Sequence, residues 1–109
     1  MIDTYQTYNI TVGALNIDSA WTTGFNNFKW NYTKFQDPKG MIDYLHNQGI
    51  RVIAWTTSLI NNDSSNFQEA KQKKYLLNDG GIIKWWHGHG AFLDYRNKDA
   101  VDWWHKQMN

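Results

Sequence analysis

The sequence predicts an α/β fold with parallel strands, and three observations support this fold. Two apolar runs, at residues 11–17 and 50–56, are rich in β-branched residues and are bounded by turn signals. Such runs are typical of strands that are covered on both faces. A helix with clear start and stop signals lies between them. Strand, helix and strand in this order form a βαβ unit, so we expect two parallel neighbouring strands.

The intervening helix is predicted for residues 38–48. Asp37 suits the N-cap because its carboxylate can accept hydrogen bonds from free N–H groups, and Pro38 suits the first helical position. Gly49 is placed to end the helix in a left-handed conformation. The predicted buried stripe consists of Met41, Ile42 and Leu45.

Before this unit, residues 1–9 show apolar side chains at roughly helical spacing, which predicts the last turns of a helix. Residues 22–35 contain five aromatic side chains, three Asn and one Gly without a regular period. Long loops in compact domains are usually functional or disordered, and this aromatic density argues against disorder. We therefore expect an ordered, irregular loop.

After residue 57 the pattern loosens. Ser65, with Gln68 three residues later, has the spacing of a capping box and predicts a short polar helix at residues 66–74. Residues 82–95 are aromatic and interrupted by Gly, without a helical or strand period. We interpret this segment as an extended excursion that contains a small hairpin.

A final helix is predicted to begin at Asn97. Its apolar face consists of Ala100, Val101, Trp104 and Met108. The chain thus has only two good core strands, whereas a parallel sheet needs more strands, with helices on both faces, to bury its apolar runs. We expect either a part of a larger α/β protein or a domain that depends on a partner.

Composition limits the functions that the chain can have. Eleven basic and ten acidic residues give a net charge of +1. The chain therefore lacks the excess of positive charge that is typical of proteins that bind nucleic acid or an anionic membrane. The absence of Cys excludes disulfides and thiolate chemistry. Seven Trp and an aromatic content of 17% suggest flat platforms for a ligand, which could be a sugar, a base or another aromatic group.

Asp18 and Trp21 follow the first predicted strand directly. In parallel α/β folds the chemistry lies just past the carboxyl ends of the strands, so these residues are predicted to supply a polar anchor and an aromatic wall to a ligand pocket. Two other interpretations stay open. Asp18 can cap a turn by binding its own backbone, and Trp21 can pack at the rim of the core.

Two further features have structural rather than functional interpretations. His87 and His89 lie in a Gly-rich stretch, but a metal site needs three or four ligands and no further pair is visible, so no metal is expected. Lys71, Lys73 and Lys74 are interpreted as the wet face of the short helix.

Four segments together carry a resemblance to a known family: NIDSAW, FQDPKGMIDYLHNQGIRVIAWTTSLI, YLLNDGG and DYRNKDAVDWWHKQM. In order and spacing they resemble glycoside hydrolase family 31, the α-glucosidase and α-xylosidase group. The resemblance runs over nearly the whole chain. It implies that residues 1–109 are part of a (β/α)₈ TIM barrel: the end of helix 1, strand 2, helix 2, strand 3, an excursion at residues 59–93 inserted after strand 3, and helix 3.

The resemblance also implies sugar-binding roles. Asp18 matches the aspartate that binds sugar hydroxyls, and Trp55 matches the tryptophan that ends strand three. Trp85 or Trp86 would supply an aromatic side chain from the excursion. The family's nucleophile and acid/base have no match among the ten acids here, so both catalytic residues are expected outside this chain, which alone should be inactive. The implied partners are an α-glycoside and the rest of the barrel, with no cofactor.

Two other functions remain open from the sequence. A non-catalytic carbohydrate-binding module would show the same richness in Trp and Asn, although such a module usually closes an antiparallel sheet of its own. A structural remnant that persists within an assembly is the third possibility. The sequence decides neither the preferred sugar nor the cellular compartment.

Overall fold

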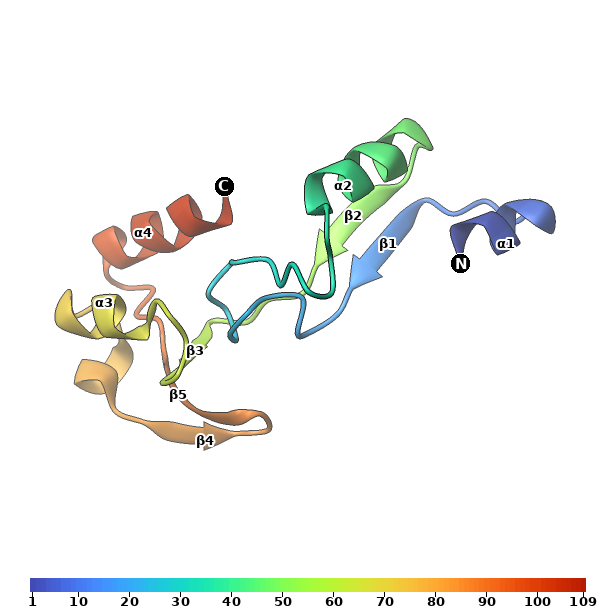
Figure 1. Cartoon of the computed structure of the whole chain (residues 1–109). Helices are drawn as coiled ribbons and strands as arrows, with labels where there is room; N and C mark the ends of the chain where they lie inside the picture. The colour runs from blue at the N-terminus through green and yellow to red at the C-terminus, as the bar shows by residue number, and fades with distance from the viewer.

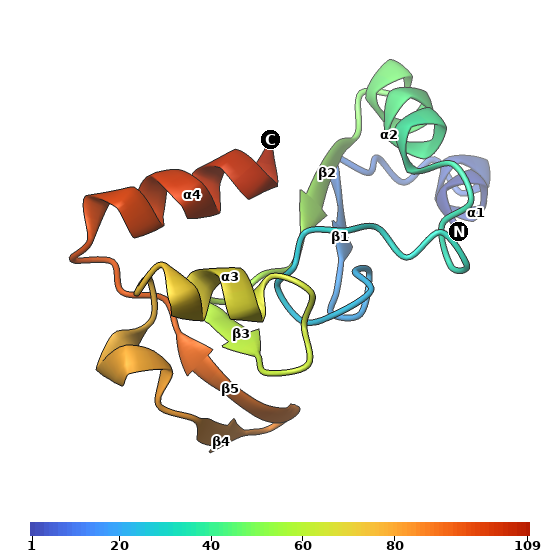
Figure 2. The ribbon, with the colours of Figure 1, turned by 60° about the vertical axis from the view of Figure 1, so that its left-hand side comes forward.

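The computed structural model describes all 109 residues, which form an elongated arrangement (Figure 1). The parallel strands and the first two helices lie at one end, and a second sheet with the last helices lies at the other (Figures 1 and 2). The radius of gyration is 16.7 Å and the principal extents are 52 × 26 × 22 Å, whereas a compact chain of about 100 residues has a radius near 13 Å. The chain therefore leaves much of its apolar surface open.

The predicted parallel pair is confirmed. β1 (Ala14–Ile17) and β2 (Arg51–Ala54) run parallel, in register from Ala14 opposite Arg51 to Ile17 opposite Ala54. Both strands are shorter than predicted, and the expectation that they are covered on both faces is wrong for this chain, since neither contains a buried residue. The reason is that α2 (Pro38–Asn47) is the main helix packed on β2, and α1 (Ile2–Thr7) buries none of its residues.

The signals that bound α2 act as the sequence predicts. The Asp37 side chain accepts a hydrogen bond of 3.0 Å from the N–H of Gly40, and Pro38 begins the helix. Gly49 has a φ of +75° directly after the helix. Of the predicted stripe only Leu45 is buried, because no further layer covers the helix.

The second sheet contains three antiparallel strands in the order β3-β5-β4. These are β3 (Leu59–Asn61), β4 (Ile83–Trp85) and β5 (Gly88–Phe92). The predicted hairpin is therefore present, as the pair β4 and β5, with Gly88 at φ +116° as the first residue of β5 after the turn. A short 3-10 helix, η1 (Leu77–Gly80), precedes β4.

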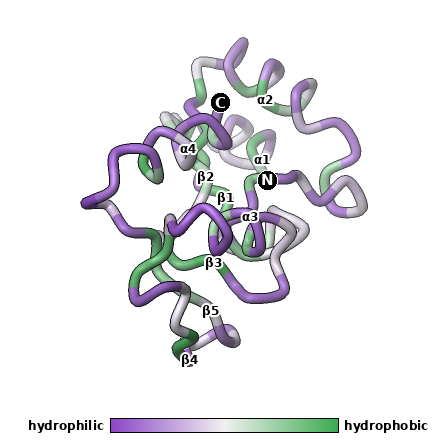
Figure 3. The backbone as a smooth tube through the Cα atoms, turned by 90° about the vertical axis from the view of Figure 1, so that its left-hand side faces the viewer, coloured by the Kyte–Doolittle hydropathy of each residue, from purple (hydrophilic) through white to green (hydrophobic).

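The buried core lies with this second sheet, beneath α3 (Phe67–Gln72) and α4 (Lys98–Met108). Its members are Ile60, Phe67, Ala70, Leu76, Ala91, Leu93, Ala100 and Trp104. Figure 3 shows hydrophobic residues in β1, β2 and β3 alike, so hydropathy does not distinguish the buried strand from the open ones. The region that looked loosely patterned in the sequence thus holds the core of the chain.

The predicted start of α3 is wrong. The N-cap is Asn66 rather than Ser65, and it makes no capping bond. The Asn66 side chain instead donates hydrogen bonds of 3.0 Å to the carbonyl of Asn26 and to the Gln107 side chain. The Asn66 side-chain oxygen, the atom that would accept a capping bond, is buried without a partner, so α3 begins without a side-chain cap.

The predicted start of α4 is confirmed, because the Asn97 side chain accepts hydrogen bonds from the N–H groups of Asp99 at 3.0 Å and Ala100 at 3.4 Å. The expected apolar face is only partly correct. Ala100 and Trp104 are buried, whereas Met108 is 51% exposed at the helix end.

Candidate functional site

The carboxyl ends of β1 and β2 meet at one edge of the parallel pair, and this edge brings two predicted site residues together. Asp18 follows Ile17 at the end of β1, and Trp55 follows Ala54 at the end of β2. The N–H of Trp55 donates a hydrogen bond of 2.9 Å to the carbonyl of Ile17. Asp18 and Trp55 therefore leave adjacent strands from neighbouring positions.

Asp18 is exposed at this edge. One oxygen of its carboxylate accepts a hydrogen bond of 2.6 Å from the N–H of Ser19, so the side chain does cap the turn. An ionised carboxylate has about four lone-pair sites on its two oxygens. The turn contact uses one of them, and the rest of the carboxylate can accept hydrogen bonds from a ligand.

The Trp21 side chain is buried and makes its contacts within the chain. Its side chain is 8% exposed, and its ring centroid lies 4.7 Å from that of Trp30. The indole N–H donates a hydrogen bond of 2.7 Å to the backbone carbonyl of Trp55. Trp21 thus fixes the end of β2 from the neighbouring strand.

Five ring-bearing side chains gather beside the end of β2, and we call them the aromatic cluster: Phe25, Trp55, Trp85, Trp86 and His87. Phe25 lies at the centre, with ring centroids 6.3 Å from Trp55, 5.6 Å from Trp85, 6.4 Å from Trp86 and 4.4 Å from His87. The rings of Trp55 and Trp86 are 6.3 Å apart. Trp86 is 67% exposed, so one aromatic surface of the cluster faces solvent.

Asn61 on β3 holds the hairpin that carries three of these rings. Its side-chain oxygen accepts a hydrogen bond of 2.7 Å from the indole N–H of Trp85, and its amide donates one of 3.0 Å to the carbonyl of His87. Asn61 is buried, and a Cβ on Gly88 would lie 3.2 Å from its amide nitrogen. The turn of the hairpin is therefore packed closely against this amide.

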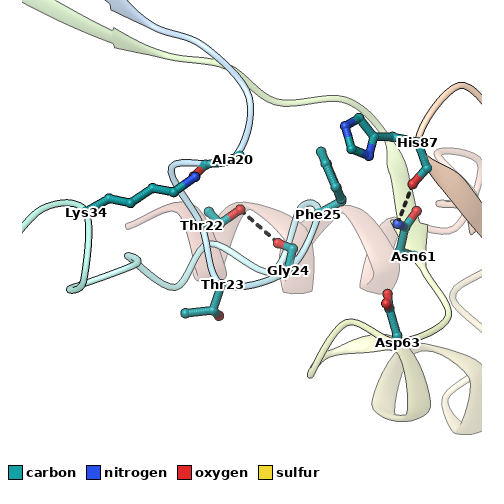
Figure 4. A pocket seen from close by; sticks show the side chains of 9 residues that line it. All are labelled: Ala20, Thr22, Thr23, Gly24, Phe25, Lys34, Asn61, Asp63 and His87. Carbon is teal, nitrogen blue, oxygen red and sulfur yellow. Dashed lines mark hydrogen bonds between the residues drawn. The ribbon is translucent and has the colours of Figure 1, made fainter.

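A pocket of about 350 Å³ adjoins the cluster (Figure 4). Phe25 and His87 belong to both, and the figure shows their rings beside each other at one end of the pocket. The remaining lining residues are mostly small or polar: Ala20, Thr22, Thr23, Gly24, Lys34, Asn61 and Asp63. Hydroxyl, amide and charged groups therefore lie next to an aromatic wall.

Some polar groups of the pocket already have partners within the chain. The Thr22 hydroxyl donates to the carbonyl of Gly24 at 2.8 Å, and the Lys34 ammonium donates to the carbonyl of Ala20 at 3.3 Å. The carboxylate of Asp63 makes no hydrogen bond or ion pair within the chain and is exposed. Aromatic side chains with a few convergent polar groups are typical of small-molecule binding sites in general.

Sequence reasoning did not assign Phe25, Asn61 or His87 to the site. The dense aromatic loop indicates that some of its rings could face a ligand, and Phe25 is one of them. Nothing in the sequence distinguishes Phe25 from the other rings of the loop. His87 was considered only as a metal ligand. Asn61 had no signal, since its role depends on the pairing of β3 with β5.

No group of three or more His, Cys, Asp or Glu side chains lies together in the structure. None of the helices is long and apolar enough to cross a membrane.

The parallel βαβ unit, with aromatic and acidic side chains at its carboxyl edge, is the repeating unit of parallel α/β folds, the class that includes the TIM barrel. Comparison with known proteins gives the family. The family described as "Glycosyl hydrolases family 31 TIM-barrel domain" matches residues 1–109. The chain belongs to this family, glycoside hydrolase family 31.

Curated relatives match the chain over most of its length. It is 34% identical to "Alpha-xylosidase XylQ" of Lactiplantibacillus pentosus over 98% of the chain and 15% of that protein. It is 29% identical to "Myogenesis-regulating glycosidase" of Mus musculus over 82% of the chain and 13% of that protein. The chain thus spans about one seventh of the length of these relatives.

Solved structures share the fold. A GH31 α-xylosidase from a soil metagenome, complexed with xylose, superposes with a TM-score of 0.84 at 20% identity and covers 97% of the chain and 16% of that structure. A Flavobacterium johnsoniae GH31 dextranase, complexed with glucose, gives 0.83 at 22% identity over 96% of the chain and 14% of that structure. These likenesses show that the chain has the fold of part of a TIM-barrel enzyme.

Proposed function

We propose that the full-length protein containing this chain is a retaining hydrolase of α-linked glucosides or related sugars, and that the chain contributes sugar-binding residues without the catalytic pair. The observation that supports this proposal is the convergence of Trp55, Trp85 and Trp86 around Phe25, at the carboxyl edge of the parallel strands that also carries Asp18. Flat aromatic faces suit the apolar side of a sugar ring, and a carboxylate suits its hydroxyls.

We further propose the position of the chain within the barrel. The parallel strands β1 and β2 would be barrel strands 2 and 3, with α1, α2 and α4 as the ends or bodies of helices 1 to 3. Residues 59–93 would be an excursion inserted after strand 3. In support, these residues form a sheet of their own between β2 and α4. The rest of the barrel would cover the open faces of β1 and β2.

The roles of the predicted site residues differ in this proposal. Asp18 would accept hydrogen bonds from sugar hydroxyls, and Trp55 with Trp85 or Trp86 would form the platform. Trp21 would support Trp55 through its hydrogen bond to the Trp55 carbonyl; its direct contact with sugar remains a prediction. Retaining hydrolysis needs two carboxyl groups about 5 Å apart, one attacking and one protonating the leaving group. Both would come from outside residues 1–109.

The test uses the full-length protein. Xylose and glucose are titrated while tryptophan fluorescence is followed, and hydrolysis of nitrophenyl α-xyloside and α-glucoside is measured in parallel. We expect saturable binding and turnover in the wild type. Asp18→Ala and Trp55→Ala should weaken both by about 10- to 100-fold, because misplacement or loss of a positioning group costs rate in this range.

Matched controls separate the site from general damage. Asp43→Asn removes an exposed acid on α2, and Trp103→Phe changes a tryptophan next to Tyr75. Both controls should retain sugar binding. A wild type that binds sugar without turnover would favour the non-catalytic alternative. No response to either sugar, or equal losses in the controls, would overturn the proposed role of the site.

A further inference from the structure

Asn26 is a buried residue with several hydrogen bonds in the loop that carries Phe25. It is 3% exposed and has a φ of 63°, a left-handed conformation that Asn tolerates better than most residues. A side-chain amide can donate two hydrogen bonds and accept two. In Asn26 all four are made within the chain.

Three of these bonds reach the segment that joins β2 to β3, and the fourth reaches Leu59 at the start of β3. The side-chain oxygen accepts from the Thr56 hydroxyl at 2.9 Å and from the N–H of Thr57 at 3.0 Å. The amide nitrogen donates to the Thr57 hydroxyl at 2.7 Å and to the carbonyl of Leu59. Trp55 comes directly before this segment. Asn26 therefore hydrogen-bonds the backbone and side chains that immediately follow the aromatic residue at the end of β2.

The backbone on either side of Asn26 is also held. The Asn66 amide donates to the Asn26 carbonyl at 3.0 Å, and the Ser64 hydroxyl donates to the Phe25 carbonyl at 2.9 Å. Phe25 is thereby fixed relative to both Trp55 and the second sheet. The hydrogen bonds hold the backbone at Phe25, and its side chain is held by packing against the other rings of the cluster.

We propose that Asn26 is a positioning residue for the sugar site: it sets the separation of Phe25 and Trp55 by locking the aromatic loop into the connection between β2 and β3. Asn26 itself touches no sugar. This inference depends on the proposed function, because the site that it positions is the proposed sugar platform. It assigns a role to a residue that lies outside both the predicted site and the pocket lining.

The first test is Asn26→Ala in the full-length protein. Loss of all four bonds should raise the KM for nitrophenyl α-xyloside and the Kd for xylose by about 10- to 100-fold. The kcat should fall less, because an aromatic platform binds ground state and transition state alike. Asn97→Ala, which removes the cap of α4, is the control that lowers stability without touching the aromatic loop.

The second test is Asn26→Asp. Its carboxyl can still accept from Thr56 and Thr57, but an ionised carboxylate would repel the Leu59 carbonyl. A protonated carboxyl would donate to that carbonyl and restore the bond, and burial raises the pKa of a carboxyl. The partners that contact this side chain, Thr56, Thr57 and Leu59, are uncharged. Sugar affinity relative to wild type should therefore recover from pH 8 to pH 5 in this variant and stay low in Asn26→Ala.

The outcomes separate the two proposals. A wild type that responds to sugar, with Asn26→Ala binding as tightly, overturns the inference and leaves the proposed function intact. Equal loss of affinity in Asn26→Ala and Asn97→Ala at matched thermal midpoints also overturns it. A wild type that binds neither sugar overturns the proposed function, and the positioning role with it. Selective loss, with recovery of Asn26→Asp at low pH, supports the inference.

Discussion

The indole N–H of Trp21 donates a 2.7 Å hydrogen bond to the backbone carbonyl of Trp55, so the tryptophan after β1 fixes the tryptophan that ends β2. The bond crosses the carboxyl edge of the parallel pair, where no further strand lies beside these two within the chain. It therefore adds a side-chain link to an edge that backbone pairing alone holds with four residue pairs.

Trp21→Phe should lower the unfolding free energy of the full-length protein by about 1–2 kcal/mol, because the Trp55 carbonyl loses its donor while a ring remains to pack. Denaturant unfolding followed by circular dichroism measures the change. Trp86→Phe is the control, since Trp86 is 67% exposed and its indole N–H has no partner within the chain. Equal midpoints for Trp21→Phe and wild type would contradict the stabilising role of this bond.

Gly90→Ala should disrupt the second sheet. A Cβ at Gly90 would overlap the carbonyl oxygen of Ile60 on the neighbouring strand, and a backbone oxygen in a ladder cannot move aside cheaply. We expect a loss of soluble protein or a large fall in the thermal midpoint. Gly13→Ala has open space around the new methyl group and should unfold within about 1 kcal/mol of wild type. Similar behaviour of the two variants would refute the close approach of β3 and β5.

How far the sequence predicts the fold depends on how local each signal is. Asp37, Pro38 and Gly49 act on the helix next to them, and their predicted roles in α2 are confirmed. The hairpin is also a short-range feature. Ser65 shows the limit: its capping pattern is present, but Asn66 instead bonds Asn26 and Gln107, both about 40 positions away along the chain.

The location of the core and half of the site required tertiary information. β1 and β2 look as apolar as β3, yet only β3 is covered, by α3 and α4. Trp55, Trp85 and Trp86 were expected in the site on the basis of family resemblance. Phe25 lies beside them in a loop whose next residue, Asn26, hydrogen-bonds the chain just after the strand end. No local pattern encodes an amide that bonds a segment 30 residues later.

Asn97→Ala should lower stability by about 1 kcal/mol, because two N–H groups at the start of α4 lose their acceptor. Ser65→Ala makes the matched comparison at α3. Its hydroxyl accepts only a 3.3 Å bond from Asn27 and caps nothing, so the change should stay within about 0.5 kcal/mol. Thermal unfolding of both variants tests this difference in stability. A larger loss in Ser65→Ala than in Asn97→Ala would contradict the absence of a Ser65 cap at α3.

The ion pair of Asp94 and Arg96 should contribute a small pH dependence to stability. The Arg96 guanidinium, which hydrogen-bonds the carboxylate at 3.0 Å, lowers the pKa of Asp94 below its usual range. Because the folded pKa is depressed, the stabilisation is present above the unfolded pKa of about 3.9 and is lost as pH falls through the folded value. The size is limited, since Arg96 is 82% exposed.

Asp94→Asn should therefore show a shallower loss of thermal midpoint than wild type as the pH is lowered from about 5 to 2. High salt should shrink the difference between the two proteins, because it screens exposed charges. Parallel curves for the two proteins across this range would mean that the pair contributes nothing.

The 109-residue polypeptide alone should neither hydrolyse nitrophenyl α-glycosides nor unfold in a cooperative monomeric transition. Hydrolysis is not expected because we propose that both catalytic carboxylates lie outside residues 1–109. Cooperativity is not expected because β1 and β2 bury none of their residues. Calorimetry and a glycosidase assay on the purified chain test both points. Turnover that Asp18→Ala abolishes would place the chemistry within this chain.

The two ends of the proposed excursion at residues 59–93 meet. Leu59 pairs with Phe92, and the N–H of Leu93 donates a hydrogen bond of 2.9 Å to the carbonyl of Ser58. A segment whose ends lie side by side can be lengthened, shortened or exchanged during evolution without moving the strand before it or the helix after it. The hairpin that carries Trp85 and Trp86 can therefore change in length while β2 and α4 keep their places.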